Sequence, residues 1–399
     1  MSRSRRRPRG RSWSRRSVVL ALVVLLLAVP GVSYAQALTA PGGGSFDVRS
    51  VSWLQDHGFA AAINRIETWR YSRDAPPSNG AIPAGSLPSA ALPKVTAPPR
   101  APTPNVPATM LLPQGPRLPV LPMLPGLPLI AGEGRWVPAG QSVDGAPAAW
   151  RAYFRPDIRH TSVLAGVLWL DQSRVVTTLA PGLGDPGRIT GAWQGAVPSP
   201  LQPKLVATWN AGFRFRDGPG GFAVAGTTAR PLVPGLASVV VDTAGRIDVR
   251  AWAGGPTPEP GVAAVRQNLR PVVLQGRAVP ELATNPGSGW GRYGQQMQYT
   301  SRTGIGVTSS GDVVVVQAPS ITLSTLGELL VRAGARTGMQ LDIHNTQVSV
   351  NVFPAGARGT TPTRLLPATN RPANRYLVAD NRDFFAAFVR GTSLPGQRP

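Results

Sequence analysis

The sequence predicts an α+β fold for residues 131–390 of this 399-residue chain, a strand-rich domain with a mixed sheet and few helices. Short apolar runs separated by Gly, Pro and Asp recur throughout the region, and this pattern is typical of β-strands. Only residues 322–333 carry apolar side chains at clear helical spacing. Many strands with few helices indicate an α+β domain, which a signal or anchor segment and a proline-rich linker precede.

The N-terminus, residues 1–37, has the layout of a secretory signal peptide or a membrane anchor. Eight arginines and no acidic residue precede an apolar run at positions 18–29. Small residues around Ala35 and Ala37 fit cleavage after either of them. The run is short for a membrane span of about 20 residues, but counting on to residue 34 lengthens it, so membrane attachment through residues 18–34 stays open. In either case we expect an exported protein, extracellular or anchored and facing the cell envelope.

Two segments connect this N-terminus to the domain. Residues 38–74 are a short N-terminal helical segment, in which residues 51–70 are expected to form one short helix, because apolar side chains recur there at nearly helical spacing with an interruption at Gly58. Residues 75–130 carry frequent prolines and no acidic residue. Such a tract favours extended conformations and acts as a semi-rigid spacer. Its apolar last part, residues 118–130, is suited to lie along the folded domain.

Inside the domain, the elements follow from apolar runs and turn signals. Residues 242–245 and 309–312 are typical hairpin turns. The helix at 322–333 has Ser324 or Thr325 as a candidate cap and Gly334 as a stop signal. Strands are expected at 162–170, 205–209, 236–242, 247–252, 272–274, 304–307, 313–318, 339–343 and 347–353.

The composition narrows the classes of partner and site. The chain has 41 basic and 19 acidic residues, a formal charge of +22, which suits a surface facing an anionic polymer or a membrane. Nucleic acid is not an expected partner, because no stripe of arginines and aromatic residues and no known binding module occurs. The absence of cysteine excludes disulfides, zinc–thiolate sites and a cysteine nucleophile. The three histidines lie far apart in sequence, so no metal site is expected, and no cofactor can be named.

Four polar clusters lie at the ends of apolar runs, at 209–213, 216–221, 301–307 and 341–345. Polar groups at a strand end are positioned by the sheet yet free to face a ligand. An arginine, a carboxylate, an amide and an imidazole that converge there suit a ligand bearing a phosphate, because the arginine binds phosphoryl oxygens and Asp or His transfers a proton.

These clusters supply the candidate site residues. Asp342 and His344 are candidate catalytic residues, two positions apart at one strand end. The candidate substrate-binding residues are Asn210, Arg302, Asp217 and Asn345. These residues could also serve the fold alone. Asn210 and Asp217 could be turn residues, Arg302 could form a structural ion pair, and His344 could be a packed imidazole.

In order and spacing, these clusters resemble the phosphodiester glycosidase family, the domain of the enzyme that uncovers mannose 6-phosphate by removing N-acetylglucosamine. The resemblance covers residues 205–353. Asn-Ala-Gly-Phe at 210–213 is similar to the family's Asn-Gly-Gly-Phe-Phe, and Arg-Thr-Gly-Ile-Gly at 302–306 to its Arg-Thr-Ala-Ile-Gly. Pro-Val-Val-Leu-Gln-Gly at 271–276 is similar to its Pro-x-Leu-Val-x-x-Gly. Its closing segment, which ends in Leu-Asp, resembles Ser320, Thr-Leu at 325–326, Gly-Ala at 334–335 and Leu-Asp at 341–342.

The chain departs from the family directly after Asp342. A glycine–serine run is replaced there by Ile-His-Asn-Thr at 343–346, and a β-branched isoleucine cannot adopt the conformations open to glycine. In this feature the chain resembles the actinobacterial branch of the family.

The resemblance implies an exported cell-envelope enzyme acting on a sugar-1-phosphodiester in a wall polymer or glycolipid. In that role Arg302 would hold the phosphate, Asn210 would bind substrate, and Asp342 would act as acid or base beside His344. The alternative is a non-catalytic envelope protein that binds an anionic polymer through the same domain. A purely structural surface protein is a third possibility.

Overall fold

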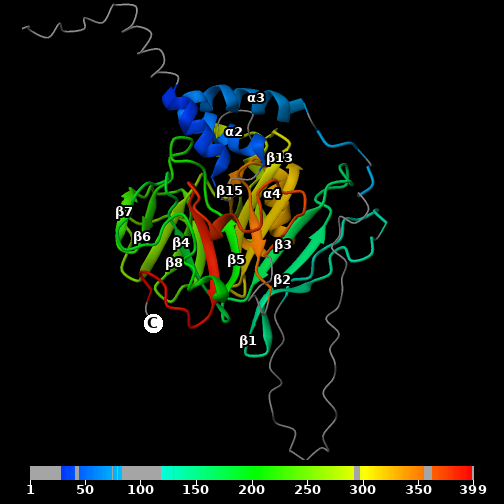
Figure 1. Cartoon of the computed structure of the whole chain (residues 1–399). Coiled ribbons are helices and arrows are strands. Elements are labelled where there is room, and N and C mark those ends of the chain that lie inside the picture. Colours follow the sequence, from blue (N-terminus) through cyan, green and yellow to red (C-terminus); the bar gives the residue numbers. More distant parts are fainter. Residues whose placement is uncertain are drawn as a thin grey trace, which may run out of the picture.

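Three antiparallel sheets form the body of the protein (Figure 1). The computed structural model describes residues 28–40, 45–73, 75–78, 80–82, 118–128, 130–291, 297–354 and 362–397. Sheet 1 contains, in spatial order, β1 (Val137–Val143), β2 (Ala146–Phe154), β3 (Ala165–Leu170), β14 (Val313–Ile321), β13 (Thr300–Thr308), β15 (Ala335–Ile343), β11 (Val273–Leu274) and β12 (Arg277–Ala278).

The other two sheets have five strands each. Sheet 2 has the order β7 (Thr227–Arg230), β6 (Phe222–Val224), β10 (Val262–Gln267), β8 (Ala237–Asp242) and β9 (Ile247–Ala251). Sheet 3 has the order β17 (Thr363–Arg364), β16 (Val350–Val352), β5 (Leu205–Asn210), β18 (Phe384–Val389) and β4 (Val175–Ala180). Short 3-10 helices occur at Gln202–Lys204, Pro280–Leu282, Pro286–Ser288 and Arg375–Leu377.

The abundance of strands and the scarcity of helices confirm the predicted strand-rich fold, but the expectation of a mixed sheet was wrong. Every ladder between the named strands is antiparallel. The predicted turns at 242–245 and 309–312 do connect β8 to β9 and β13 to β14, and Gly245 and Gly311 adopt positive φ there. Turns this short can join only antiparallel strands.

The centre of sheet 1 is buried on both faces, which explains its continuous apolar runs. In β14, Val313 and Val315 belong to the core shared with sheets 2 and 3. Val314 and Val316 belong to a second core on the opposite face. Side chains alternate between the two faces of a strand, so these four successive valines pack in turn into the two cores.

The helix α4 (Leu323–Arg332) covers this second face of sheet 1. Its N-cap is Thr322, whose Oγ1 accepts a hydrogen bond from the Thr325 backbone N–H at 3.3 Å. The expected caps, Ser324 and Thr325, lie inside the helix instead, because the side chain of Thr322 already satisfies an N–H of the first turn. Gly334, with φ +91°, follows the helix as expected.

Close packing at Gly306 of β13 gives a stability prediction. A Cβ at this position would lie 2.6 Å from the Ala335 Cβ and 2.7 Å from the Thr337 carbonyl oxygen. Since backbone must then shift, we expect Gly306→Ala to lower the free energy of unfolding by about 1–3 kcal/mol, as urea unfolding would measure. Gly255→Ala is the matched control, because no atom lies within 4 Å of its added Cβ. Equal stabilities of the two variants would contradict the prediction.

The single helix expected in residues 38–74 is divided in two. Helices α2 (Phe46–Leu54) and α3 (Ala60–Arg73) flank a five-residue π-helical turn, Gln55–Phe59. Gly58 has φ +94° and interrupts the regular helix, because its missing Cβ permits this conformation. Figure 1 shows α2 and α3 across one end of the sheets, above the ends of β13 and β15.

The expected signal or anchor and most of the proline-rich spacer lie outside the described residues. Residues 28–39 are helical. Among the residues that the structure describes, no helix has the length and apolar character to cross a membrane. The end of the spacer lies against the domain, where Leu121 is buried and Pro119 accepts a hydrogen bond from Trp136 Nε1 at 2.8 Å.

Candidate functional site

Asp342 ends up buried at the end of β15, with 8% of its surface exposed. Its Oδ2 accepts a hydrogen bond from Arg382 Nη2 at 2.9 Å, and its Oδ1 accepts one from the Ile343 backbone N–H at 2.9 Å. Its own N–H donates to the Ala211 carbonyl oxygen, at the exit of β5. The carboxylate is therefore fixed where sheets 1 and 3 meet.

Arg382 precedes β18 and joins Asp342 to a second carboxylate. Its Nη1 donates to Asp185 Oδ2 at 2.7 Å, and its Nη2 also reaches the Gly212 carbonyl oxygen at 3.0 Å. Burial lowers the pKa of Arg382, but the charges of Asp342 and neighbouring carboxylates outweigh it and raise the pKa overall. Burial raises the pKa of Asp342, and Arg382 opposes this rise. A permanent cation thus lies beside a carboxyl group shifted toward the range useful for proton transfer.

A small cavity of about 70 Å³ opens at Asp342. His344 takes φ +72°, the left-handed conformation in which glycine is usual. Its Nδ1 lies 2.9 Å from Thr300 Oγ1. Burial and the charge of Arg302 lower the pKa of His344 to about 3, so the imidazole is neutral at ordinary pH. The residues lining the cavity are Gln55, Asn64, Phe213, Arg214, Asp217, Asp342, Ile343, His344 and Gln347.

Glu67 of α3 approaches the same site from the N-terminal segment. Its Oε2 lies 3.8 Å from His344 Nε2. Burial raises the pKa of Glu67 to about 7, with Arg214 opposing and Asp342 adding to the rise. Since His344 is neutral and Glu67 is largely protonated below pH 7, their contact is not an ion pair.

The raised pKa of Glu67 predicts a pH-dependent stability. Between pH 4.5 and about 7 the carboxyl ionises in the unfolded chain but stays protonated in the folded one, so stability falls as pH rises through this window. The shift corresponds to at most about 3 kcal/mol. We therefore expect Glu67→Gln to gain stability relative to wild type as pH rises from 4.5 to 7.5, measured by urea unfolding. The exposed Glu281→Gln is the control, and an identical pH dependence of Glu67→Gln and wild type would refute the prediction.

Asn210 holds strands together rather than facing a cavity. Its Nδ2 donates to Thr303 Oγ1 at 2.8 Å, and its Oδ1 accepts from the Ser349 backbone N–H at 2.9 Å. Thr303 Oγ1 in turn donates to the Asp342 carbonyl oxygen at 2.9 Å. Asn210 thus positions the backbone at Asp342 and lines neither this cavity nor the larger one described below.

Arg302 is similarly enclosed, with 1% of its surface exposed. Its guanidinium donates to the Ile321 carbonyl oxygen and to Gln340 Oε1, both at 2.9 Å. Burial lowers its pKa to about 9. These bonds join β13 to β14 and β15, and the side chain lines neither cavity.

The remaining two candidates lie at the margins. Asp217 is exposed and lines the small cavity, in a turn closed by its N–H and the Arg214 carbonyl oxygen. Asn345 lines neither cavity, and its Oδ1 accepts from the Asn370 N–H at 3.3 Å. The structure therefore brings together Asp342, His344 and Asp217, and places Asn210, Arg302 and Asn345 outside the cavities.

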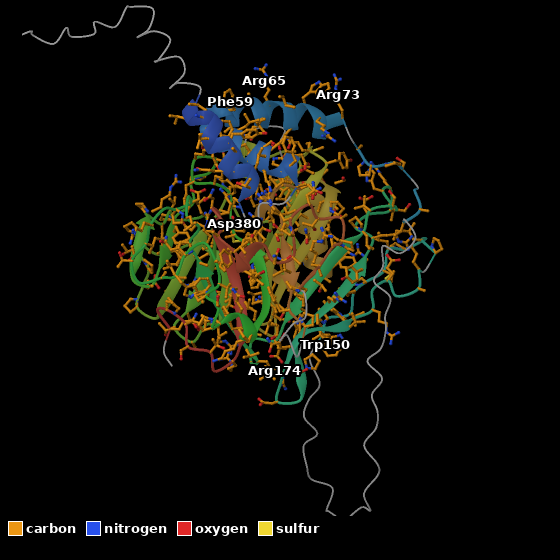
Figure 2. The ribbon with its side chains drawn as sticks, in the orientation of Figure 1. Phe59, Arg65, Arg73, Trp150, Arg174 and Asp380 are labelled. Atoms are coloured by element: carbon orange, nitrogen blue, oxygen red, sulfur yellow. The ribbon has the colours of Figure 1, made fainter. Side chains whose placement is uncertain are left out.

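A larger cavity of about 730 Å³ lies between the N-terminal helices and the sheets, and Arg214 and Gln347 line both cavities. Figure 2 shows Asp380, which lines it, at the end of the sheets below α2. Its ionic lining is dominated by guanidinium groups, with five arginines against three aspartates. They are Arg49, Arg214, Arg216, Arg371 and Arg382, with Asp56, Asp185 and Asp380.

The sequence interpretation missed Arg214, Arg382 and Gln347. Arg382 could have been found by the same rule as the four polar clusters. The polar residues 380–383 directly precede the apolar run of β18, just as each of those clusters adjoins an apolar run. Gln347 had none. No group of three His, Asp or Glu side chains within the described ranges is placed to hold a metal ion.

Comparisons with known proteins give distant structural likenesses, two of which follow. No protein-family model and no curated protein matches the sequence. The catalytic domain of zebrafish N-acetylglucosamine-1-phosphodiester alpha-N-acetylglucosaminidase, auto-inhibited by its pro-peptide, matches at 10% identity and a TM-score of 0.40, over 63% of this chain and 87% of that one. A hypothetical protein from Synechocystis matches at 13% identity and a TM-score of 0.37, over 64% of each chain. Values this low assign neither a family nor an activity.

Proposed function

We propose that the protein is an exported cell-envelope hydrolase that cleaves a sugar-1-phosphodiester in a wall polymer or glycolipid. The observation that carries the proposal is the buried carboxylate of Asp342, fixed by Arg382 at a cavity that Arg214 also lines. The motif resemblance of residues 205–353 to phosphodiester glycosidases supports the same chemistry.

Hydrolysis of such a diester breaks the bond between the anomeric carbon and the phosphate oxygen. Water adds to the anomeric carbon, and the phosphate leaves with the bonding electron pair. Asp342 would accept the proton of the attacking water, and the guanidinium groups of Arg214 and Arg382 would stabilise the negative charge on the leaving phosphate. We assign the phosphate to these two arginines rather than to Arg302, because Arg302 lines neither cavity.

Helix α3 would have to move for a sugar to reach Asp342, because its Asn64 lines the small cavity. The cavity of about 70 Å³ has room for a few water molecules only. Gln55 and Asn64 line it from the N-terminal segment, and Gln55 Oε1 accepts a hydrogen bond from Arg214 Nη2 at 3.1 Å. Glu67 of α3 approaches His344 beside it. Ionisation of Glu67 above pH 7 would weaken the buried contact, so we expect hydrolysis to be faster at pH 8 than at pH 6.

The second candidate is a non-catalytic protein that binds an anionic polymer of the envelope through the same domain. The excess of arginine in the larger cavity favours it. Such binding would weaken as salt screens the charges, without turnover.

The deciding experiment is an assay of the full chain on a synthetic N-acetylglucosamine 1-phosphodiester. Release of the sugar over the uncatalysed rate at pH 6 to 8.5 is the expected result. The proposed hydrolase would be rejected if no sugar were released from any sugar-1-phosphodiester tested. Salt-sensitive binding of an anionic wall polymer in the same experiments would then support the binding protein.

A further inference from the structure

The larger cavity is lined by three arginines that the proposed hydrolysis at Asp342 does not use, Arg49, Arg216 and Arg371. Asp56 pairs with Arg214 and lies 4.0 Å from Arg216, and Asp185 pairs with Arg382. Asp380 is bound by Arg375, which does not line the cavity. Each lining carboxylate is thus already engaged, while the lining arginines outnumber them.

The positive charges in this cavity repel one another. Burial, Arg382 and Arg216 lower the pKa of Arg214, although Asp56 opposes them. Burial and Arg375 lower the pKa of Arg371 to about 9. A bound anion would offset both effects, since an opposite charge within a few ångströms favours the charged guanidinium.

Unsatisfied buried atoms lie at the same place. Arg382 Nε and both side-chain amide atoms of Gln347 are buried without a hydrogen-bond partner among the described residues. Both side chains line the larger cavity and are more than nine-tenths buried. Buried polar groups are nearly always satisfied in folded proteins, so these atoms indicate a polar ligand.

The two cavities share Arg214 and Gln347, so a ligand can extend from one into the other. We infer that the larger cavity binds a second phosphate group, the next phosphodiester unit of a chain whose first unit lies at Asp342. The geometry thus selects an oligomeric phosphodiester over an isolated one. This inference rests on the proposed function for the chemistry of the ligand, and it adds that α2 contributes to the binding site through Arg49 and Ser52.

Calorimetric titration with a short poly(glycerol phosphate) oligomer and with sn-glycerol 3-phosphate tests the inference. The oligomer should bind at least about tenfold more tightly than the single phosphate, because it adds charge-assisted hydrogen bonds. Arg216→Gln should weaken oligomer binding by about three- to tenfold. Arg250→Gln is the matched control, since its side chain is 44% exposed against 41% for Arg216 and also neighbours an aspartate, but it lies on β9 outside the cavity.

Gln347→Met provides a second variant. It removes both unsatisfied amide atoms at nearly constant shape, so the protein should be as stable as wild type or more so, yet bind the oligomer less tightly. Equal affinity for the oligomer and the single phosphate, or unchanged oligomer binding in both variants, would overturn the inference. The titration measures binding independently of hydrolysis. Tighter binding of the oligomer without sugar release would therefore reject only the proposed hydrolase activity. Sugar release without a preference for the oligomer would reject only the second phosphate site.

Discussion

Asp342→Asn is expected to lower kcat for sugar release by about 10²- to 10⁴-fold, the usual contribution of a positioned general acid or base. The amide keeps an oxygen that can accept the Ile343 N–H, and it can no longer accept a proton at neutral pH. Arg382 retains Asp185 as a carboxylate partner, so its charge stays compensated. The phosphate-binding arginines remain, and we expect KM to change much less than kcat.

Steady-state kinetics of the purified variant measure this effect, after thermal unfolding has confirmed that it is folded. Asp248→Asn is the matched control, because Asp248 is an exposed carboxylate on β9 paired with Arg250. A folded Asp342→Asn protein with the kcat of wild type would remove Asp342 from the chemistry.

Arg266→Met is expected to lower the free energy of unfolding by about 3–5 kcal/mol, the usual cost of breaking a buried ion pair. Arg266 of β10 pairs with Asp383 next to β18, and their side chains are 1% and 0% exposed. Its guanidinium also donates to the Phe213 and Gln267 carbonyl oxygens. The substitution leaves Asp383 buried without this cation and frees the loop that carries Arg214.

Urea unfolding of Arg266→Met measures this loss, with Arg250→Met as the control. Arg250 and Asp248 form an exposed pair at 3.2 Å, and such pairs contribute about 0–1 kcal/mol. The double variant Arg266→Met with Asp383→Leu should regain part of the loss, because it no longer buries an unpaired charge. Similar losses at the buried and exposed pairs would contradict this account.

Several elements of the fold were readable from local sequence. The turns at 242–245 and 309–312 join adjacent strands, and α4 begins and ends within one residue of its predicted range. Short strands such as β6 and β17 gave no clear signal. With three and two residues, they are too short for an alternating pattern and depend on neighbouring strands for their hydrogen bonds.

The candidate site was only partly accessible to the same reasoning. Polar residues at strand ends pointed to Asp342 and His344, which do line a cavity. The same rule selected Asn210 and Arg302, whose donors instead bind Thr303 and backbone or side-chain oxygens inside the sheets. A strand end fixes where a residue lies, but its neighbours in space determine whether its polar atoms are already engaged.

The sequence by itself determined the strand-rich class, the hairpins, α4 and the location of one buried carboxylate at the end of β15. Only the tertiary structure placed Arg382, Arg214 and Glu67 around Asp342, from segments 40, 128 and 275 residues away along the chain. The physical reason is that turns and amphipathic patterns arise from residues adjacent in sequence, whereas charge pairing and burial depend on which distant segments the packing of three sheets and two N-terminal helices brings together.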